Sequence, residues 1–265
     1  MADVIGYSLV ATVYTQEGVA AVGDATVQLK IDTGMRRVGA DHATAFKLAQ
    51  TIPKLEGVWT HFAVADRPDD PFTDEQARRF DAFLADLATA GVRPPLRHAC
   101  NSAGLLNYPR HRYDMVRCGL ALYGIGGPDH GLRPALSLRS RVSFVKEIDA
   151  GEGVSYGLRY HAPARTTIAT VPIGYADGVP WRLGVTGGEV LIGGRRRPIA
   201  GAVTMDQLTV DCGPDDPVQP GDEVTLIGRQ GGEEITAQEW ADTLGTISYE
   251  ILTGVGPRVP RRYRD

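Results

Sequence analysis

The sequence predicts an α/β half over residues 1–130, followed by a mainly antiparallel β domain over residues 131–265. Two patterns support this division. In the first half, short apolar runs alternate with helical patterns, which is typical of a parallel sheet or a (β/α)8 barrel. Beyond a glycine- and proline-rich stretch at residues 128–134, strand patterns follow one another between Gly, Pro and Asp turns, which is typical of an antiparallel sheet.

The first half contains strand and helix patterns in alternation. The helix at residues 73–90 has the clearest pattern, because Thr73 can cap it and Phe80, Phe83 and Leu87 fall on one face. Strands are expected at residues 10–14, 27–31, 55–62, 96–100 and 115–118, and further helices at residues 43–50 and from Ser102. A closed barrel needs eight strands. We therefore expect a partial TIM-type barrel whose first strands are missing.

The second half contains mostly strand patterns. Strands are expected at residues 136–148, 166–173, 190–192, 198–203, 208–212 and 223–227, with a single helix at residues 236–244. The basic run Arg195-Arg196-Arg197 follows Gly193-Gly194. We interpret this run as a solvated hairpin turn rather than a binding patch.

The composition excludes several classes of protein. The net charge of −4 gives no electrostatic footprint for nucleic acid or an anionic membrane. No apolar run reaches the length of a membrane span, and the N-terminus lacks the pattern of a signal peptide. The three cysteines, Cys100, Cys118 and Cys212, have no metal-binding spacing. An odd number of cysteines favours reduced thiols and hence a cytoplasmic protein.

Two tyrosines stand out because glycines and other small residues flank them. Tyr156 lies in Gly-Val-Ser-Tyr-Gly, and Tyr175 lies in Pro-Ile-Gly-Tyr-Ala-Asp-Gly. Glycine permits backbone shapes that can hold a neighbouring side chain at a site. Such a tyrosine can be a half-buried residue at a strand end, a hydrogen-bond donor or a proton-transfer group. The two segments alone leave these alternatives open.

Six further motifs, and their order along the chain, indicate which of these roles the tyrosines have. Together with the two tyrosine segments, the motifs resemble alanine racemase, the barrel enzyme of fold type III that depends on pyridoxal 5'-phosphate (PLP). The motifs are Lys30-Ile-Asp-Thr-Gly-Met-Arg-Arg37, Thr60-His61-Phe, His98-Ala-Cys-Asn-Ser102, Arg117-Cys-Gly119-Leu120, Thr204-Met205-Asp-Gln and Ser248-Tyr249-Glu.

The resemblance implies a two-base interconversion of L-alanine and D-alanine, which supplies D-alanine for peptidoglycan. Tyr156 matches the base that the partner subunit of a homodimer contributes. His61 and, behind it, Arg117 match the residues that favour the phenolate form of this tyrosine. Arg117 also matches the arginine that faces the pyridine nitrogen of PLP. An arginine there argues against a decarboxylase of the same architecture, whose cofactor nitrogen is protonated.

The resemblance also implies binding residues. Ser102, Gly119, Leu120 and Tyr249 match groups that hold the cofactor phosphate. Arg37 and Met205 match contacts to the substrate carboxylate, and Tyr175 and Asp177 match positions on the access channel.

Lys30 matches a lysine that carries a carbamate in many relatives, although a plain surface pair between Lys30 and Asp32 remains an alternative. Ala202 stands where relatives often have an arginine, which leaves the breadth of substrates open.

One departure from the family pattern concerns the lysine that forms the Schiff base with PLP. In the family it lies in a Lys-Ala-x-Ala-Tyr-Gly segment near the N-terminus, and no such segment occurs in the sequence. We therefore expect a chain that lacks its N-terminal segment and is inactive alone. The alternatives are a non-catalytic dimerising fragment and an amino-acid racemase of broader specificity.

Overall fold

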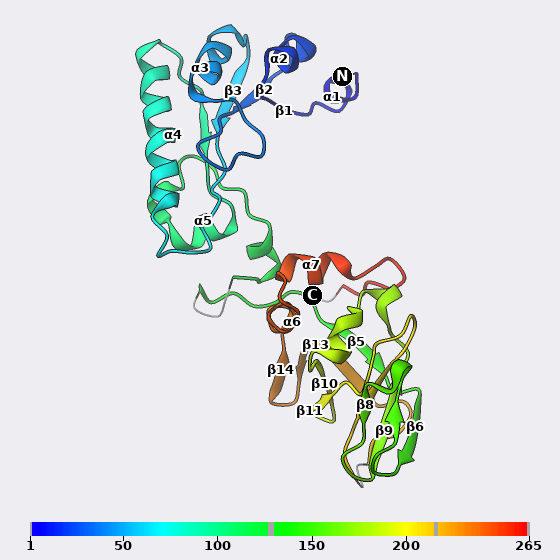
Figure 1. Ribbon diagram of the computed structural model, residues 1–265. Coiled ribbons are helices and arrows are strands. Elements are labelled where there is room, and N and C mark those ends of the chain that lie inside the picture. The colour runs from blue at the N-terminus through cyan, green and yellow to red at the C-terminus, as the bar shows by residue number, and fades with distance from the viewer. Residues whose placement is uncertain (1, 127–129, 215–216, 264–265) are drawn as a thin grey trace. The chain divides into compact units, whose positions relative to one another are not determined.

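The protein divides into two compact units, Met1–Leu132 and Arg133–Asp265 (Figure 1). The computed structural model describes residues 2–126, 130–214 and 217–263. Residues 128 and 129 of the predicted boundary lie outside the described residues, and the predicted division after residue 130 stays a prediction.

The first unit contains a four-stranded parallel sheet in the order β1-β2-β3-β4. The strands are β1 (Ala11–Val13), β2 (Val27–Lys30), β3 (Leu55–Trp59) and β4 (Leu96–His98). The helices are α1 (Ala2–Gly6), α2 (Gln16–Val22), α3 (His42–Thr51), α4 (Phe72–Thr89) and α5 (Ser102–Asn107), with short 3-10 turns at Pro109–His111 and Leu120–Tyr123.

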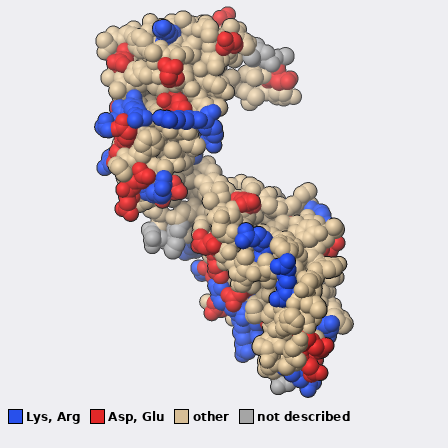
Figure 2. Space-filling view, viewed as in Figure 1, with Lys and Arg blue, Asp and Glu red and all other residues tan. Residues whose placement is uncertain are grey.

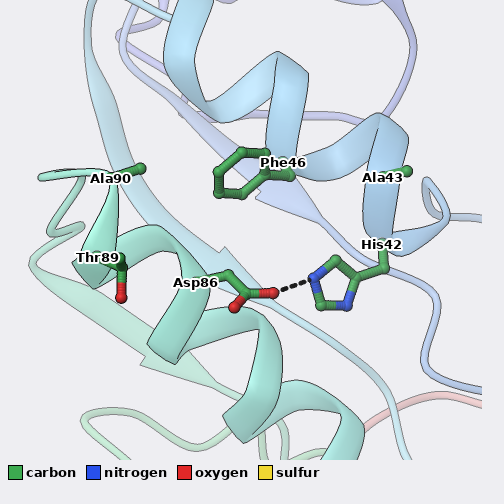
Figure 3. Close-up of a pocket in the computed structure, with 6 residues that line it drawn as sticks. All are labelled: His42, Ala43, Phe46, Asp86, Thr89 and Ala90. Carbon is green, nitrogen blue, oxygen red and sulfur yellow. Dashed lines mark hydrogen bonds and ion pairs between the residues drawn. The ribbon is translucent and has the colours of Figure 1, made fainter.

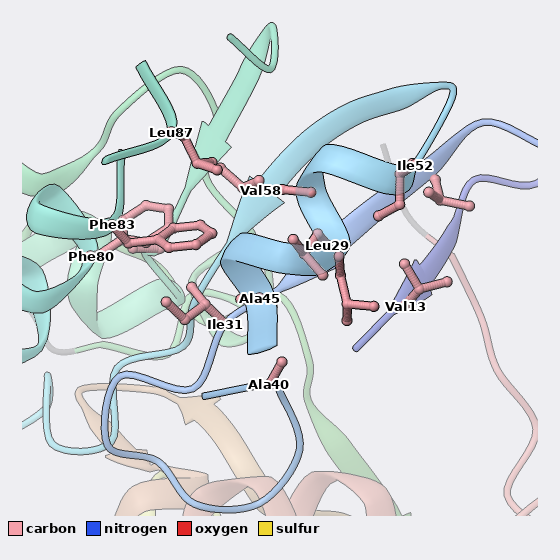
Figure 4. Packing of buried hydrophobic residues seen from close by; sticks show 14 of the residues in the cluster. Val13, Leu29, Ile31, Ala40, Ala45, Ile52, Val58, Phe80, Phe83 and Leu87 are labelled. Atoms are coloured by element: carbon pink, nitrogen blue, oxygen red, sulfur yellow. The ribbon is translucent and has the colours of Figure 1, made fainter. Parts of the chain in front are cut away.

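The core of the first unit lies between the sheet and the helices α3 and α4 (Figure 4). Leu29 and Val58 are fully buried on the sheet, and Phe80, Phe83 and Leu87 are fully buried on α4. The apolar residues of α4 recur at helical spacing, so one face of this helix covers the sheet. This packing fixes the carboxyl ends of β2, β3 and β4, where the candidate site lies.

The prediction of a strand at residues 115–118 was wrong. This segment runs beside β4 but forms only one bridge, from Met115 to His98. The N–H of Arg117 donates to the carbonyl of Cys100 at 2.9 Å. The segment therefore remains tied to β4 without a regular ladder. The helices α1 and α2 had not been predicted.

The second unit contains antiparallel sheets. Its main sheet has the order β11-β10-β13-β14 with β5 paired to β13, a second sheet has the order β12-β9-β6, and β7 pairs with β8. The strands are β5 (Leu138–Arg141), β6 (Phe144–Ile148), β7 (Gly153–Val154), β8 (Tyr160–His161), β9 (Thr166–Val171), β10 (Glu189–Ile192), β11 (Arg195–Pro198), β12 (Leu208–Asp211), β13 (Glu223–Gln230) and β14 (Glu233–Ile235). The helices are α6 (Ala237–Leu244) and α7 (Ser248–Gly254).

Three predictions for the second unit were wrong. The run at residues 136–148 forms two strands, β5 and β6, rather than one. The expected strand at 198–203 is displaced, because β11 ends at Pro198. The helix α7 is a second helix where only one was expected, and its seven residues are too few to give a clear helical period.

The arginine run is also a correction. The turn is formed by Gly193 and Gly194, both with positive φ, and the arginines form β11. Arg196 is not solvated alone, because its guanidinium lies within 3.0 Å of the carboxylates of Glu189, Glu233 and Glu239. The run is therefore a strand held by a local ion-pair network.

One face of each unit can be seen in the space-filling view. On the face that Figure 2 shows, basic and acidic side chains are interspersed rather than gathered in one area of a single sign. Among the described residues, no helix combines the length and the apolar character that a membrane span requires.

Candidate active site

The candidate site of the first unit lies at the carboxyl ends of three parallel strands. Lys30 ends β2, Trp59 ends β3 and His98 ends β4, and the three residues are paired in register across the sheet. Lys30 Nζ lies 4.5 Å from the centre of the Trp59 ring, and the His98 ring stacks on that indole at 5.6 Å. Adjacent parallel strands thus bring a lysine, an indole and an imidazole into one row.

Arg117 lies beside this row and is held from several sides. Its Nη1 lies 2.6 Å from His98 Nδ1, and its Nη2 lies 3.1 Å from His61 Nδ1. Nη2 also donates to the carbonyls of Thr60 and Ala99, each at 3.0 Å. The guanidinium lies 4.5 Å from the centre of the Trp59 ring. The contacts from β3, β4 and the segments that follow them fix its orientation.

The cluster concentrates positive charge in a buried place. Burial, and then the charge of Arg117, lower the pKa of both His61 and His98 to about 4. Burial lowers the pKa of Arg117 to about 10. Burial, followed by the charges of Arg37 and Arg117, lowers the pKa of Lys30. The two histidines are therefore neutral at pH 7.

The predicted alternative of a surface pair between Lys30 and Asp32 is wrong, because Lys30 is only 2% exposed. Asp32 instead accepts hydrogen bonds from the backbone N–H groups of Gly34 and Arg36, at 2.8 and 3.1 Å. These bonds shape the loop that carries Arg37, which is exposed. Arg37 is nevertheless close enough to lower the pKa of both Lys30 and His61.

Ser102 and the segment after Arg117 form a second group in the first unit. The hydroxyl of Ser102, the first residue of α5, accepts hydrogen bonds from the backbone N–H groups of Gly119 and Ala121, at 3.0 and 3.2 Å. A Cβ added at Gly119 would meet no atom within 4 Å. Leu120 begins the 3-10 turn that follows. The backbone N–H groups of Gly119 and Ala121 therefore both point to the Ser102 hydroxyl, and there is open space beside Gly119.

Tyr156 lies in the second unit, on a turn with an unusual backbone. Ser155 has φ 64° and ψ −175°, and Leu158 has φ 47°. Residues other than glycine rarely adopt such backbone angles. The angles cost conformational free energy and persist only where the surrounding structure enforces them. The Ser155 hydroxyl donates to the carbonyl of Ala202 at 2.8 Å. The turn exposes 77% of Tyr156 at a surface hollow of about 430 Å³, which Thr204 and Gln207 also line.

Met205 and Tyr175 are held together in the second unit. The backbone N–H groups of Tyr175 and Ala176 donate to the carbonyls of Thr204 and Met205, each at 3.0 Å. Gly174 permits this approach, since a Cβ there would lie 2.2 Å from the carbonyl oxygen of Thr204. Tyr175 and Met205 are about half exposed.

Arg258 joins the same two loops through ion pairs. Its guanidinium forms ion pairs with Asp177, at 3.2 Å, and with Asp206, at 2.6 Å. Tyr249 lies at the start of α7 and is half exposed, whereas Ala202 is buried at 2% exposure. The predicted site residues therefore form two sets, one in each unit.

A separate surface hollow of about 330 Å³ lies between α3 and α4 (Figure 3). His42 and Asp86 line it, and His42 Nε2 lies 2.8 Å from Asp86 Oδ2, with both side chains about half exposed. None of the predicted site residues lines this hollow.

Trp59, His98 and Gln28 had no predicted role, although Trp59 and His98 contact Arg117 and Gln28 contacts His98. His98 Nε2 lies 2.7 Å from the side-chain oxygen of Gln28. Polar or aromatic residues at the last positions of successive parallel strands are the signal that would have identified Trp59 and His98, because such positions meet at one edge of the sheet.

The fold and the site define a protein with a barrel-type α/β domain, a cationic cluster at the carboxyl ends of its strands, and a β domain. Family models of the alanine racemase N-terminal domain and C-terminal domain match residues 1–126 and 135–263. The chain belongs to the alanine racemase family. The predicted resemblance is thereby confirmed.

Individual relatives agree with this assignment. An alanine racemase from Symbiobacterium thermophilum is 52% identical over 90% of this chain and 66% of the relative. One from Salinispora arenicola is 47% identical over 94% of the chain and 69% of the relative. The crystal structure of alanine racemase from Streptomyces lavendulae matches with a TM-score of 0.90 and 39% identity, over 99% of this chain and 74% of that one. The chain thus spans about two thirds of the length of these curated relatives, and the predicted fold class is confirmed.

Proposed function

We propose that this chain acts as a PLP-dependent alanine racemase that interconverts L-alanine and D-alanine. The observation that carries the proposal is the fixed guanidinium of Arg117 within a buried cationic cluster at the carboxyl ends of the strands. The D-alanine product would supply peptidoglycan synthesis.

The residues of the cluster fit an anionic, phosphorylated cofactor. Arg37 and Arg117 bring two cations near each other, and both are close enough to lower the pKa of Lys30. Among the described residues, the buried indole N–H of Trp59 has no acceptor. A cluster rich in donors and positive charge favours a ligand that brings acceptors and negative charge.

Each end of PLP would have its own partners. Ser102, with the backbone N–H groups of Gly119 and Leu120 and the hydroxyl of Tyr249, would hold the phosphate. Arg117 would face the pyridine nitrogen. A guanidinium has no acceptor and keeps its proton, so the nitrogen opposite it would stay unprotonated.

PLP, when bound, would spread the negative charge that remains after the α-proton of alanine leaves. The rest of the mechanism belongs to residues of the protein. Because Arg117 can only donate, His61 Nδ1 must accept, and the single proton of neutral His61 must lie on Nε2. That N–H would donate to the phenol oxygen of Tyr156. A hydrogen bond to the charged form of the phenol lowers its pKa, so Tyr156 would act as the base on one face of the substrate.

The substrate carboxylate would contact Arg37 by charge and Met205 through its backbone N–H, while Tyr175 would line the access channel. Lys30 would carry a carbamate. Its lowered pKa favours the neutral amine, which attacks carbon dioxide, and loss of one proton leaves the anionic carbamate. This anion would orient Arg37.

We further propose a homodimer in the cytoplasm. Tyr156 and Met205 lie in the second unit, whereas His61, Ser102 and Arg117 lie in the first. In the dimer, the second-unit residues of one subunit would complete the first-unit site of the partner subunit, which requires a two-fold axis. None of Cys100, Cys118 and Cys212 forms a disulfide, which agrees with a reducing compartment.

The test joins the chain to the N-terminal segment of the Symbiobacterium thermophilum relative. The fusion should bind PLP, seen by its absorption, and convert D-alanine to L-alanine, seen by chiral chromatography. Arg117→Ala in the fusion should weaken both. If the folded fusion binds no PLP, the alternative of a non-catalytic dimerising protein is favoured. Comparable turnover of several amino acids would favour the broader racemase.

A further inference from the structure

A line of side chains runs from Arg117 across the sheet and away from the candidate site. Arg117 Nη1 lies 2.6 Å from His98 Nδ1. His98 Nε2 lies 2.7 Å from Gln28 Oε1, and Gln28 Nε2 lies 3.1 Å from Glu56 Oε2. Gln28, Glu56 and His98 come from β2, β3 and β4, and Arg117 from the segment before the 3-10 turn Leu120–Tyr123.

Because arginine can only donate hydrogen bonds, the hydrogen bonds along this line all run in one direction, away from Arg117. A guanidinium has five N–H donors and no acceptor, so His98 Nδ1 must accept from Arg117. A neutral imidazole carries one proton, which must then lie on Nε2. Gln28 must therefore present its oxygen to His98 and its NH2 group to Glu56, whose carboxylate can only accept. Only this arrangement pairs a donor with an acceptor at each of the three contacts.

We infer that Gln28 is a positioning residue that keeps His98 neutral, with its proton on Nε2, so that His98 holds the guanidinium of Arg117 in place. If His98 Nδ1 became protonated, it could no longer accept the hydrogen bond from Arg117, and the imidazolium and guanidinium cations would repel each other. A neutral amide at position 28 accepts the Nε2 proton without attracting a second one. A carboxylate at the same place would stabilise the imidazolium ion and release Arg117.

The surroundings of His98 agree with this role. Its side chain is almost fully buried, at 2% exposure, and it stacks on Trp59. Burial and the charge of Arg117 favour the neutral ring, whereas the charge of Asp114 acts in the opposite direction. Arg117 and Asp114 are the charged groups that act on this ring from the neighbouring segment.

The connection to the cofactor rests on the proposed function, because Arg117 matters there only if it faces PLP. The state of His98 does not rest on it and can be measured without cofactor. In the full chain labelled with 15N, long-range proton–nitrogen NMR distinguishes the two ring nitrogens of each of the six histidines. The His98 signals are assigned by their loss in His98→Gln.

In the unaltered chain, His98 should carry its proton on Nε2 and should stay neutral from pH 7 to about pH 5. Gln28→Glu should raise the midpoint of the His98 titration by about 1 to 3 pH units, the effect of an opposite charge at hydrogen-bond distance. The matched control is Gln50→Glu on α3, where the side chain bonds only the carbonyl of Phe46, at 3.4 Å. This control should leave the His98 midpoint unchanged.

A proton on Nδ1, or a charged His98 at pH 7, in the unaltered chain would overturn the inference without any variant. So would an unchanged midpoint in a folded Gln28→Glu chain. In the fusion enzyme, Gln28→Glu should weaken PLP binding while Gln50→Glu should not. If the NMR result holds and the fusion lacks activity, the proposed function fails and the inference stands.

Discussion

At the residue scale, Tyr156 is the side chain whose role is easiest to test. Replacing it by Phe removes one hydroxyl and leaves the ring, so the turn should keep its shape. In the active fusion enzyme, Tyr156→Phe should lower the rate by about 100- to 10,000-fold, the usual contribution of a positioned base, while PLP absorption stays the same. Chiral chromatography gives the rate.

The matched control is Tyr263→Phe, since Tyr263 is 94% exposed and belongs to no predicted site. It should retain full activity. A Tyr156→Phe enzyme with more than about a tenth of the original rate would be incompatible with a base at this position.

The lowered pKa values of two histidines, His61 and the buried His98, predict how the stability of the first unit changes with pH. In the folded protein, His61 and His98 have pKa values of about 4, below the ordinary 6.5. Between pH 6.5 and 4 the unfolded chain binds protons that the folded chain does not. The free energy of unfolding should therefore fall as the pH falls through this window, by about 1 kcal/mol for each histidine after allowance for solvent screening.

Urea unfolding at pH 7, 5.5 and 4.5, followed by NMR signals of β2 and β3, measures this change. Carboxylates with lowered pKa values, such as Asp74 and Asp114, become protonated only below their ordinary 3.8, outside this window. His98→Gln should remove about half of the dependence. Equal unfolding midpoints at the three pH values would show that both histidines bind protons equally well in the folded and unfolded chain.

At the element scale, the contact between the loops at Gly174 and Thr204 is held by backbone packing. A Cβ at position 174 would lie 2.2 Å from the carbonyl oxygen of Thr204, although its φ of −148° suits any residue. Gly174→Ala should therefore force the loops apart and reduce the stability of the second unit by about 1 to 3 kcal/mol. Thermal unfolding measures the loss.

The matched control is Gly232→Ala, since a Cβ there meets no atom within 4 Å. It should change the stability little. Equal melting temperatures for the two variants would mean that the loops separate without cost.

The sequence predicted the elements whose pattern is long or strongly periodic. Helix α4 has an apolar face at regular spacing, and β2, β3 and β4 are short apolar runs between turns. Helix α7 escaped prediction because its seven residues give no clear helical period. Strand β11 escaped because three successive arginines resemble a solvated turn, whereas Arg196 pairs with the carboxylates of Glu189, Glu233 and Glu239, which are remote in sequence or across the hairpin.

Some residues of the candidate site could be predicted from the sequence, and others could not. Arg117 and Ser102 could be identified by motif, and both lie among polar partners. The burial of Lys30 was not apparent, because a lysine two residues from an aspartate suggests a surface pair. Nor was the line through Gln28 and Glu56, since Gln28 and His98 lie 70 residues apart in sequence and meet only when β2, β3 and β4 pair.

At the scale of the whole molecule, the proposed homodimer makes a prediction about mixed subunits. In the fusion enzyme, Tyr156→Phe and Arg117→Ala should each be inactive alone. If sites are shared, a mixed dimer has one site with both substitutions and one with neither, so activity should return on mixing. With random exchange, about half of the dimers are mixed and each has one intact site, so about a quarter of the original activity is expected.

Chiral chromatography measures the activity, and co-purification of tagged subunits shows whether exchange has taken place. A mixture of two Tyr156→Phe preparations with different tags is the control and should stay inactive. Proven exchange without any return of activity would mean that each chain builds its own site.

The turn at Ser155 bears on how this protein would respond to selection for heat resistance. Ser155→Gly would relieve about 1 to 3 kcal/mol of backbone strain, against about 1 kcal/mol lost with the hydrogen bond to Ala202. The same change would also allow more backbone conformations in the turn that holds Tyr156. A laboratory screen that rewards survival at high temperature would thus tend to enrich glycine at this position and discard catalytic rate. Only a screen that also demands D-alanine would retain the serine.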